Sequence, residues 1–554
     1  MAVVLLLCSS ACGTNPSTLT YDNIPESTGG KDVERSAAAD DVFSLNCNSK
    51  YSFNPIIATN HSNQLVCSLV YENMIELDND FNVIKNIIVD WDYSEDYKSW
   101  IFTIDTAHTF HDGTPVTGKD LRYSLERAVT ADRFSGRFAS FQGASYTDDK
   151  LYVTLGIGDS QFIKLLNIPV IQYGTHGDDF PGGSGPYMYN EDHTQLLPYE
   201  GYVGLPMEPE EAEEEEEESS SGFALAGEEE EQKDEIIHAE IKHPVDVIYL
   251  KEYTDAGSII SAFEDSYIDV VINDPSSYTN LGYASTNEIH TYPTTNLHYV
   301  VFNEAGVLGK YSNFRYAMNF AFDRSNFVDL LHGNAVASPV AMYPTCAEYP
   351  EELANNLVYD LDMCKTVMEN AGVQDYDGDG MLEYMSGTPQ EIELVFIVCS
   401  DSSAKTGVVR RFADDMATLG LKITVKELSW DKYLLALEEG NFDLYYGEIK
   451  LRNNFDLTEL VQVRDEDEPG SNLNFSRSVD TSYITYVNNY LSAREADRPV
   501  LYRNLAEFVA QNAMLIPIGF EKQQIICHRG VVKGVNANIG NPLFDFVNWE
   551  FVEG

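Results

Sequence analysis

Positive charge is scarce in this sequence, and its scarcity excludes one class of partner. The 554 residues contain 35 Lys and Arg against 89 Asp and Glu, which gives a formal net charge of -54 at pH 7. Such a chain repels phosphate backbones and anionic lipid head groups, and no basic stripe offsets the repulsion. We therefore exclude nucleic acid as a partner.

Motifs of covalent chemistry are also missing. The sequence has no H-E-x-x-H zinc motif. In the stretch GGSGP, residues 182–186, proline stands where a serine nucleophile elbow has glycine. We interpret GGSGP instead as the return from an inserted domain, followed by a strand that contains Tyr187 and Tyr189.

The cysteines do not form a recognisable framework. Their spacing matches neither a zinc site nor a disulfide-rich scaffold. Cys47 with Cys67, or Cys346 with Cys364, could pair in an exported protein. Buried free thiols are the interpretation that we favour.

No repeat period is visible, and the chain is too long for one hydrophobic core, so we expect two or three lobes. Short apolar runs such as VFSLNC alternate with helical patterns such as GKDLRYSLERAV, which predicts mixed α/β lobes. Further helical patterns occupy residues 314–333 and 359–372. Gly333 and Gly372 are placed to end these helices, and Asp360 is a candidate N-cap.

The N-terminus, MAVVLLLCSSACGTN, joins an apolar run too short to span a bilayer to small residues and a cysteine. This layout is typical of a secretion signal, and SSAC resembles the lipobox of bacterial lipoproteins. The resemblance implies a signal peptide at residues 1–12 with lipid attached to Cys12, although Ser9 replaces the usual aliphatic residue and no Lys or Arg precedes the run. Residues 13–41 are polar and small, as in a flexible tether, although a buried N-terminal strand is the other interpretation.

Residues 206–235, PMEPEEAEEEEEESSSGFALAGEEEEQKDE, are nearly all acidic or small. Such a segment cannot bury enough apolar surface to order itself. We expect a disordered acidic insertion on a surface loop.

The stretch HTFHDGTPVTGKDLRYSLERAV, residues 108–129, places two histidines and an aspartate close together, as a catalytic or metal site does. The residues before it alternate like a strand, HDGTP has the composition of a turn, and TGKDLRYSLERA predicts a threonine-capped amphipathic helix. Nothing identifies a nucleophile or a substrate proton for His111. We therefore interpret His111 and Asp112 as parts of a strand-turn-helix corner.

This stretch resembles the fingerprint of the extracellular solute-binding proteins of ABC importers, family 5, which includes oligopeptide-, dipeptide- and nickel-binding proteins. Other segments on either side of it occur in the family's order. They are LVYENMIELD, GGSGPYMY, SAFEDSYIDVV, VVFNEAG, NFRYAMNFAFDRSNFVDLLHGNA, AGVQDYDGDGMLEY, LGLKITVKELSWDKYLLALEEGNFDLYYG and LIPIGFE. Together they span nearly the whole chain from residue 42 onward.

The resemblance implies an α/β, two-lobed periplasmic-binding-protein-like fold (type II, hinge-closing) with an extra domain inserted in the first lobe. We expect lobe I at residues 42–73, 185–296 and 515–554, the inserted domain at 74–184, and lobe II at 297–514. The implied activity is solute binding between the lobes and delivery to ABC permease subunits, with no catalysis. We expect a monomer without a cofactor, tethered by its lipid to the outer face of the cytoplasmic membrane, on the extracellular or periplasmic side.

A cleft between lobes needs aromatic or apolar walls and a few placed polar groups. Alternation along NFDLYYGEIKLRNNFDL predicts a strand with Tyr446, Glu448 and two basic residues on one face. A solvent-facing edge strand is the other interpretation, and the family resemblance favours a cleft wall. The residues that we expect to bind the solute are Tyr51, Asn54 and Tyr71 on lobe I and Trp430, Tyr446, Glu448, Lys450 and Arg452 on lobe II.

Peptide-binding members of the family often carry a tryptophan after the glycine of this strand and an aspartate a few residues on, which pairs with the peptide's amino terminus. Here Glu448 follows the glycine, and Leu451 or Arg452 stands near the aspartate's place. Glu448 could receive an ammonium, whereas Lys450 and Arg452 favour a carboxylate or another anion. Peptides are the first ligand class, and a nickel chelate or another small polar solute is the alternative, with His298 as its candidate histidine.

Two other function classes stay open at this point. An exported hydrolase of peptides or cell-wall fragments has no nucleophile or zinc motif to support it. A signalling protein that presents its ligand to a membrane sensor has the same sequence features as an import component.

The loop DYDGDGMLE presents oxygen ligands of the kind that calcium prefers, at Asp375, Asp377, Asp379 and Glu383. The loop is not a full EF-hand, because Ser386 occupies the twelfth position. A polar loop without metal is the alternative to a structural calcium site.

Overall fold

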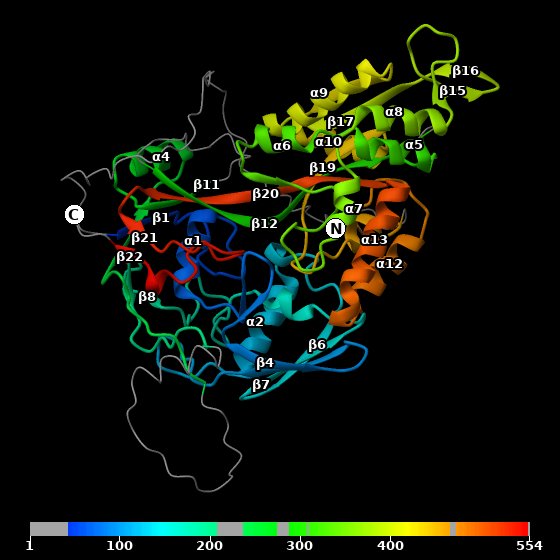
Figure 1. Cartoon of the computed structure of the whole chain (residues 1–554). Coiled ribbons are helices and arrows are strands. Elements are labelled where there is room, and N and C mark those ends of the chain that lie inside the picture. Colours follow the sequence, from blue (N-terminus) through cyan, green and yellow to red (C-terminus); the bar gives the residue numbers. More distant parts are fainter. Residues whose placement is uncertain are drawn as a thin grey trace, which may run out of the picture.

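The computed structural model describes residues 43–207, 236–273, 287–306, 309, 311–465 and 472–551 (Figure 1). The predicted signal peptide, the tether and the lipid-bearing Cys12 lie outside these residues. So does the predicted acidic insertion, apart from its first two residues.

One large mixed sheet runs through the described part of the molecule. Its main path has the order β18-β17-β19-β12-β20-β11-β1-β10-β9-β8, and β13 pairs with β20 beside it. The strands are β1 (Phe43–Cys47), β8 (Tyr187–Tyr189), β9 (Gln195–Pro198), β10 (Ile248–Glu252), β11 (Val270–Asn273), β12 (Asn287–Phe302), β13 (Ala335–Ala337), β17 (Glu393–Cys399), β18 (Lys422–Leu428), β19 (Leu444–Lys450) and β20 (Leu515–His528).

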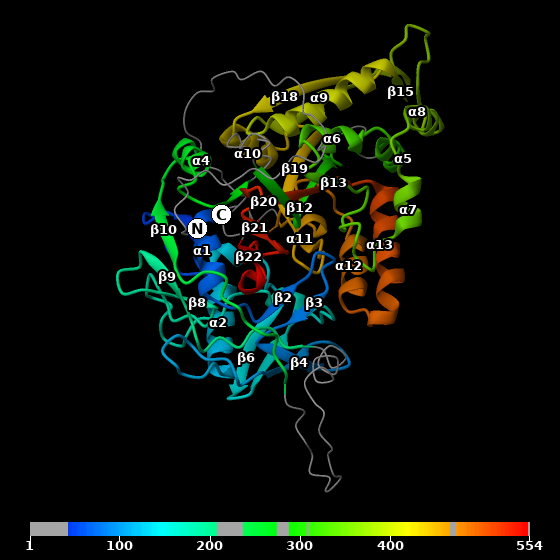
Figure 2. The same cartoon turned by 60° about the vertical axis from the view of Figure 1, so that its left-hand side comes forward.

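The two longest strands, β12 and β20, connect the two halves of this sheet (Figures 1 and 2). The first half of β12 pairs with the end of β20, which in turn pairs with β11 of lobe I. The second half of β12 pairs with β19 of lobe II. The pairing of β12 with β20 shifts register between Pro293 and Leu297 and again between His298 and Tyr299. Irregular pairing bends strands, so a hinge between the lobes is expected at this crossing.

The inserted domain is built on a separate four-stranded antiparallel sheet, with α2 packed against β6 and β7 (Figures 1 and 2). Its strands, in sheet order, are β4 (Ile88–Tyr93), β5 (Ser99–Ile104), β7 (Lys150–Leu155) and β6 (Phe141–Thr147), and α2 spans Gly118–Thr130. The predicted alternation is present in β5, where Trp100, Phe102 and Ile104 are buried. Thr117 is the N-cap of α2, and it donates its backbone N–H (3.0 Å) and its hydroxyl (2.7 Å) to the Asp120 carboxylate.

His111 and Asp112 have the architectural role that the sequence predicts. The His111 ring lies 3.0 Å from the backbone oxygen of Gly185, which links this corner to the GGSGP segment. Asp112 accepts hydrogen bonds from Thr114 within the turn and from Gln172 at 2.8 Å. Gly113 adopts φ +81°, which a residue with a side chain rarely adopts.

The predicted helix at residues 314–333 is two helices in the structure, α5 (Ser312–Ala317) and α6 (Arg324–Leu330), with a short 3-10 turn after α5. The break occurs because Asp323 caps a new helix by accepting from Asn326 N–H at 3.2 Å. The predicted cap at Asp360 is confirmed, since its carboxylate accepts from Met363 N–H at 2.8 Å at the start of α8 (Leu361–Asn370).

The remaining elements cover the sheets or form small ribbons. The helices are α1 (His61–Val70), α4 (Ala256–Glu264), α7 (Glu351–Asn356), α9 (Ser403–Thr418), α10 (Trp430–Glu439), α11 (Thr458–Val461), α12 (Ser482–Leu491) and α13 (Arg498–Asn512). The strands are β2 (Ile75–Leu77), β3 (Val83–Lys85), β14 (Val373–Gln374), β15 (Glu383–Ser386), β16 (Thr388–Glu391), β21 (Val532–Lys533) and β22 (Glu550–Phe551).

One hydrophobic core extends from lobe I through the inserted domain to the near face of lobe II, and a second core lies under α5, α6, α8 and α9 of lobe II. Within the described residues the cysteines are buried and free, as predicted; they are Cys47, Cys67, Cys346, Cys364, Cys399 and Cys527. In the same residues, no helix has the length and apolar character needed to cross a membrane.

Candidate functional site

The inserted domain and lobe II are in direct contact on the side of the sheet that faces α12 and α13. The Phe81 ring packs against Tyr343 and Phe455, with centroids 5.5 Å and 4.9 Å away. Ser160 donates its backbone N–H to the Leu491 oxygen at 2.7 Å. Aromatic packing and a backbone hydrogen bond thus join the inserted domain to lobe II.

Arg137 lies at this contact, near Arg133 and Arg452. Arg133 and Arg137 lie just after α2 in the inserted domain, and Arg452 follows β19 in lobe II. Arg452 forms ion pairs with Asp456 and with Glu459, the latter at 2.9 Å. The arginines therefore come from both sides of the hinge.

Arg133 and Arg137 have no carboxylate within ion-pair distance among the described residues. Arg133 donates to the backbone oxygen of Pro55, and Arg137 donates to that of Asn167 at 2.9 Å. Burial, together with the positive charges of Arg133 and Arg452, lowers the pKa of Arg137 to about 10. A half-buried pair of cations without a counter-ion is a place where an anionic group of a ligand gains charge-assisted hydrogen bonds.

Asp159 lies at the same contact. Its carboxylate accepts hydrogen bonds from Gln161 N–H at 2.9 Å and from the Asn454 amide of lobe II at 2.8 Å. Burial and the negative charge of Asp456 raise the pKa of Asp159 to about 7, although both hydrogen bonds and Arg452 act in the opposite direction.

Closure is therefore expected to depend on pH. If opening exposes Asp159 to water, its pKa falls from about 7 to the ordinary value of about 4. Between these two pH values Asp159 is protonated in the closed form and ionised in the open form. The stabilisation of the closed form is fully present below this range and is lost as pH rises through about 7. Affinity for the bound solute should thus be several-fold higher at pH 5.5 than at pH 8 in calorimetric titrations. An equally steep pH dependence in Asp159→Asn would contradict this assignment.

The predicted lobe I residues lie in different surroundings. Tyr51 is exposed on the surface. Asn54 is buried, and its amide donates to the His176 oxygen at 2.8 Å. Tyr71 is buried, donates its hydroxyl to the Pro181 oxygen at 3.0 Å, and lines a pocket at the junction of lobe I and the inserted domain.

On lobe II, Tyr446 and Glu448 share one face of β19, as predicted, but this is the face covered by α9. The Tyr446 hydroxyl lies 3.0 Å from His298, and Glu448 pairs with Lys405 of α9 at 2.5 Å. The opposite face, with Tyr445 and Ile449, belongs to the core that reaches the inserted domain. Lys450 is exposed at the end of β19, and Trp430 stacks on Tyr433 at the start of α10. Of the eight predicted residues, the structure places Arg452 at the contact between the inserted domain and lobe II.

His298 lies at the crossing of the two lobes, as its position in the sequence suggests, and is buried between Glu521 and Tyr446. Its Nε2 lies 2.9 Å from the Glu521 carboxylate, and its Nδ1 lies 3.0 Å from the Tyr446 hydroxyl. Both ring nitrogens thus face protein groups.

The comparisons with known proteins decide the family. A family model described as bacterial extracellular solute-binding proteins, family 5 middle, matches residues 82–458. The chain belongs to this family. The glutathione-binding protein GsiB of Pectobacterium atrosepticum is 25% identical over 174 residues, which are 28% of this chain and 34% of GsiB. A putative ABC transporter peptide-binding protein of Brucella ovis is 21% identical over 349 residues, 59% of each protein. The chain thus spans less than two thirds of these curated relatives.

Solved structures of low identity show that the fold is shared, and the predicted two-lobed α/β fold is confirmed. The ABC transporter substrate-binding protein CtaP of Listeria monocytogenes has a TM-score of 0.67 at 16% identity, covering 93% of this chain and 100% of CtaP. NikZ of Campylobacter jejuni in complex with Ni(L-His) has a TM-score of 0.62 at 14% identity, covering 92% of this chain and 99% of NikZ.

Sequence reasoning missed two arginines of this family 5 protein. Arg133 and Arg137 stand in ADRFSGRFAS, a stretch without a recognisable motif. Their importance depends on how the lobes meet, since Arg452 is more than 300 residues away in the sequence. The spacing of the two arginines is no signal, since Arg494 and Arg498 are also four positions apart.

The acidic loop of lobe II brings together the four predicted side chains, Asp375, Asp377, Asp379 and Glu383, with ligand oxygens within 4.8 Å of one another. Calcium at this loop stays a prediction. The expected result is that millimolar calcium raises the melting temperature and that Asp377→Asn removes the increase, because a carboxylate ligand is lost. Equal increases in both proteins would contradict a calcium site here.

Proposed function

We propose that this family 5 protein is the lipid-anchored binding component of an ABC importer and that it captures peptides between its closing lobes. The observation that carries the proposal is that Arg137 lies near Arg133 and, across the hinge, near Arg452, so that both positive charges act on it. A peptide's terminal carboxylate supplies the negative charge that the first two arginines lack.

Closure and binding are linked in this proposal. A ligand stabilises the closed form only through contacts that the open form does not offer. A carboxylate held by arginines from both sides of β12 and β20 provides such contacts. This is solute binding without covalent chemistry, and the bound peptide then passes to the permease.

The proposed lipid at Cys12 serves a separate purpose. An acyl anchor holds the protein on the outer face of the cytoplasmic membrane, so that its permease is encountered at a high effective concentration. Recognition of the peptide does not require the lipid.

A second candidate ligand follows from the same geometry. Chelates of nickel and other small polar solutes also carry carboxylates, which the same arginines would bind. His298 supports the nickel version in one respect, because it offers a ligand atom within 4.8 Å of carboxylate oxygens of Glu448 and Glu521.

The test is to purify the chain from residue 13 onward, record native mass spectra, and identify what is released on denaturation. A series of peptide masses is the expected result. One non-peptide species would transfer the proposal to that solute, whereas an empty protein that hydrolyses a peptide pool would overturn it in favour of an enzyme.

A further inference from the structure

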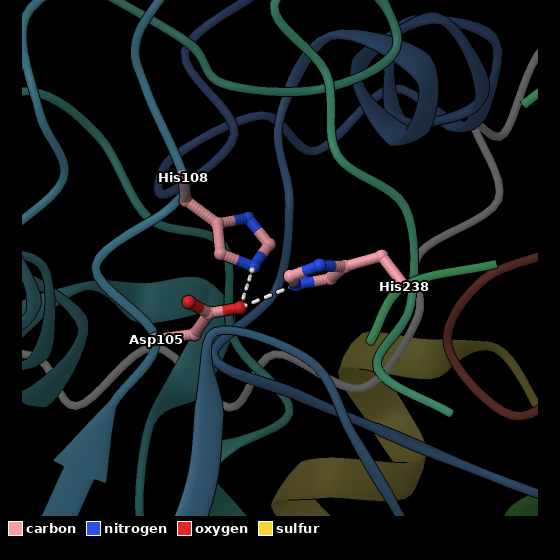
Figure 3. A group of neighbouring side chains, drawn as sticks. All are labelled: Asp105, His108 and His238. Atoms are coloured by element: carbon pink, nitrogen blue, oxygen red, sulfur yellow. Dashed lines mark hydrogen bonds and ion pairs between the residues drawn. The ribbon is translucent and has the colours of Figure 1, made fainter. Parts of the chain in front are cut away.

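Two histidines and two carboxylates meet where the inserted domain joins lobe I (Figure 3). Asp105 and His108 follow β5, Glu72 precedes β2, and His238 comes from a segment 133 residues beyond Asp105. The side chains of Asp105, His108 and Glu72 are at most 5% exposed, and that of His238 is 17% exposed. Burying four ionisable side chains together costs free energy unless they pair with one another or bind an ion.

Both imidazole rings direct a nitrogen at the same oxygen of Asp105 (Figure 3). His238 Nε2 lies 2.5 Å from Asp105 Oδ2, and His108 Nε2 lies 3.6 Å from it. The other polar atoms of His108 and Asp105 also have partners. His108 Nδ1 lies 3.0 Å from the Glu72 carboxylate, and Asp105 Oδ1 accepts from Ala107 N–H at 2.9 Å.

One buried ring nitrogen in this group makes no hydrogen bond. His108 Nε2 has no hydrogen bond among the residues that the structure describes. When Nδ1 donates its proton to Glu72, Nε2 presents a lone pair to the carboxylate oxygen of Asp105. Two facing acceptors repel each other, so this geometry favours either a second proton on the ring or a metal ion between the two atoms.

We propose that His108 Nε2, His238 Nε2 and Asp105 Oδ2 bind one divalent cation of the zinc class. Two imidazoles and a carboxylate are a common ligand set for zinc, and they are too rich in nitrogen for calcium. Glu72 acts as the outer carboxylate that orients His108.

The distances fit this ion with a small adjustment. Ligand atoms of a tetrahedral zinc ion with bonds of about 2.0 Å lie about 3.3 Å apart. The His108–Asp105 separation of 3.6 Å is already close to that value. The His238–Asp105 separation of 2.5 Å must lengthen by about 0.8 Å, which the partly exposed His238 side chain permits.

The ion would link the inserted domain to the later segment that carries His238. His238 lies opposite Pro206 in an isolated bridge, and Met207 and Ala239 donate backbone hydrogen bonds to Ile237 and Leu205 at 2.8 Å and 3.0 Å. Metal binding would therefore join both ends of the acidic stretch to the inserted domain.

The experiment is a calorimetric titration of the chelator-treated chain with zinc, followed by visible absorption spectra with Co²⁺. One ion per chain is expected, with an affinity tighter than about 1 μM and tetrahedral Co²⁺ bands. His238→Ala should weaken binding more than about 100-fold, and Glu72→Gln about 10- to 100-fold. Because His238 is partly exposed, its replacement should leave the fold intact.

His332→Ala is the matched control, since His332 is an exposed histidine of lobe II and its loss should not change zinc affinity. Deleting residues 208–235 tests whether the acidic stretch itself binds the ion, and unchanged affinity is expected. Retention of full affinity in His238→Ala, loss of binding in the deletion variant, or no binding tighter than about 100 μM would each overturn the proposal. None of these results bears on the solute proposed for the interlobe contact.

Discussion

Arg137→Met is expected to weaken binding of the co-purified solute about 100-fold without lowering the melting temperature. Losing one partner of a buried, hydrogen-bonded charge pair costs about 3 kcal/mol of binding free energy, which corresponds to that factor. The stability of the free protein should change little, because Arg137 has no carboxylate partner among the described residues and its positive charge is partly desolvated. Isothermal titration with the solute identified by mass spectrometry measures the change.

Arg127→Met is the matched control for this variant. Arg127 lies on the exposed side of α2 and contacts the Tyr123 ring, so the same charge is removed from the same domain. Its affinity should be unchanged. Equal affinities of wild type and Arg137→Met would show that the arginine pair does not bind the solute.

Lys405→Met is expected to lower the free energy of unfolding by about 3 kcal/mol, since it leaves Glu448 largely buried without its cation. Burial opposes ionisation of Glu448, but Lys405 and His298 lower its pKa below the ordinary value. The double variant Lys405→Met with Glu448→Gln should recover most of the loss, because no uncompensated charge remains. Urea unfolding followed by tryptophan fluorescence measures these differences.

The exposed pair Lys422 and Glu393, on the edge of the same sheet, supplies the comparison. The two side chains are 56% and 53% exposed, so Lys422→Met should cost less than about 1 kcal/mol.

Glu448→Gln also tests the sequence-based prediction that Glu448 binds the solute. If its solute affinity falls about 100-fold, Glu448 meets the ligand's ammonium; an unchanged affinity is expected from its pairing with Lys405.

Local patterns predicted the features that local forces determine. The threonine cap of α2, the turn at Gly113 and the Asp360 cap each depend on a few neighbouring residues, and all are present. The family resemblance supplied the two-lobed fold. The break at Asp323 was missed because continuous helical spacing conceals a second cap inside the pattern.

The site was harder to predict, for two physical reasons. Strand β19 is buried on both faces, so Tyr445 and Tyr446 give no alternation from which to choose the cleft side. The arginines and the histidine cluster come together only by tertiary contact. Arg137 meets Arg452, and His238 meets Asp105, across sequence separations that no spacing rule covers.

The most direct test of the account compares a bound peptide with its C-terminally amidated form. Peptides identified in the released mixture are synthesised in both forms and titrated into wild type and Arg137→Met. The account predicts that amidation weakens binding to wild type about 100-fold and has little further effect on the variant, since both changes remove the same interaction. Equal affinity of the two forms for wild type would contradict carboxylate recognition by the interlobe arginines.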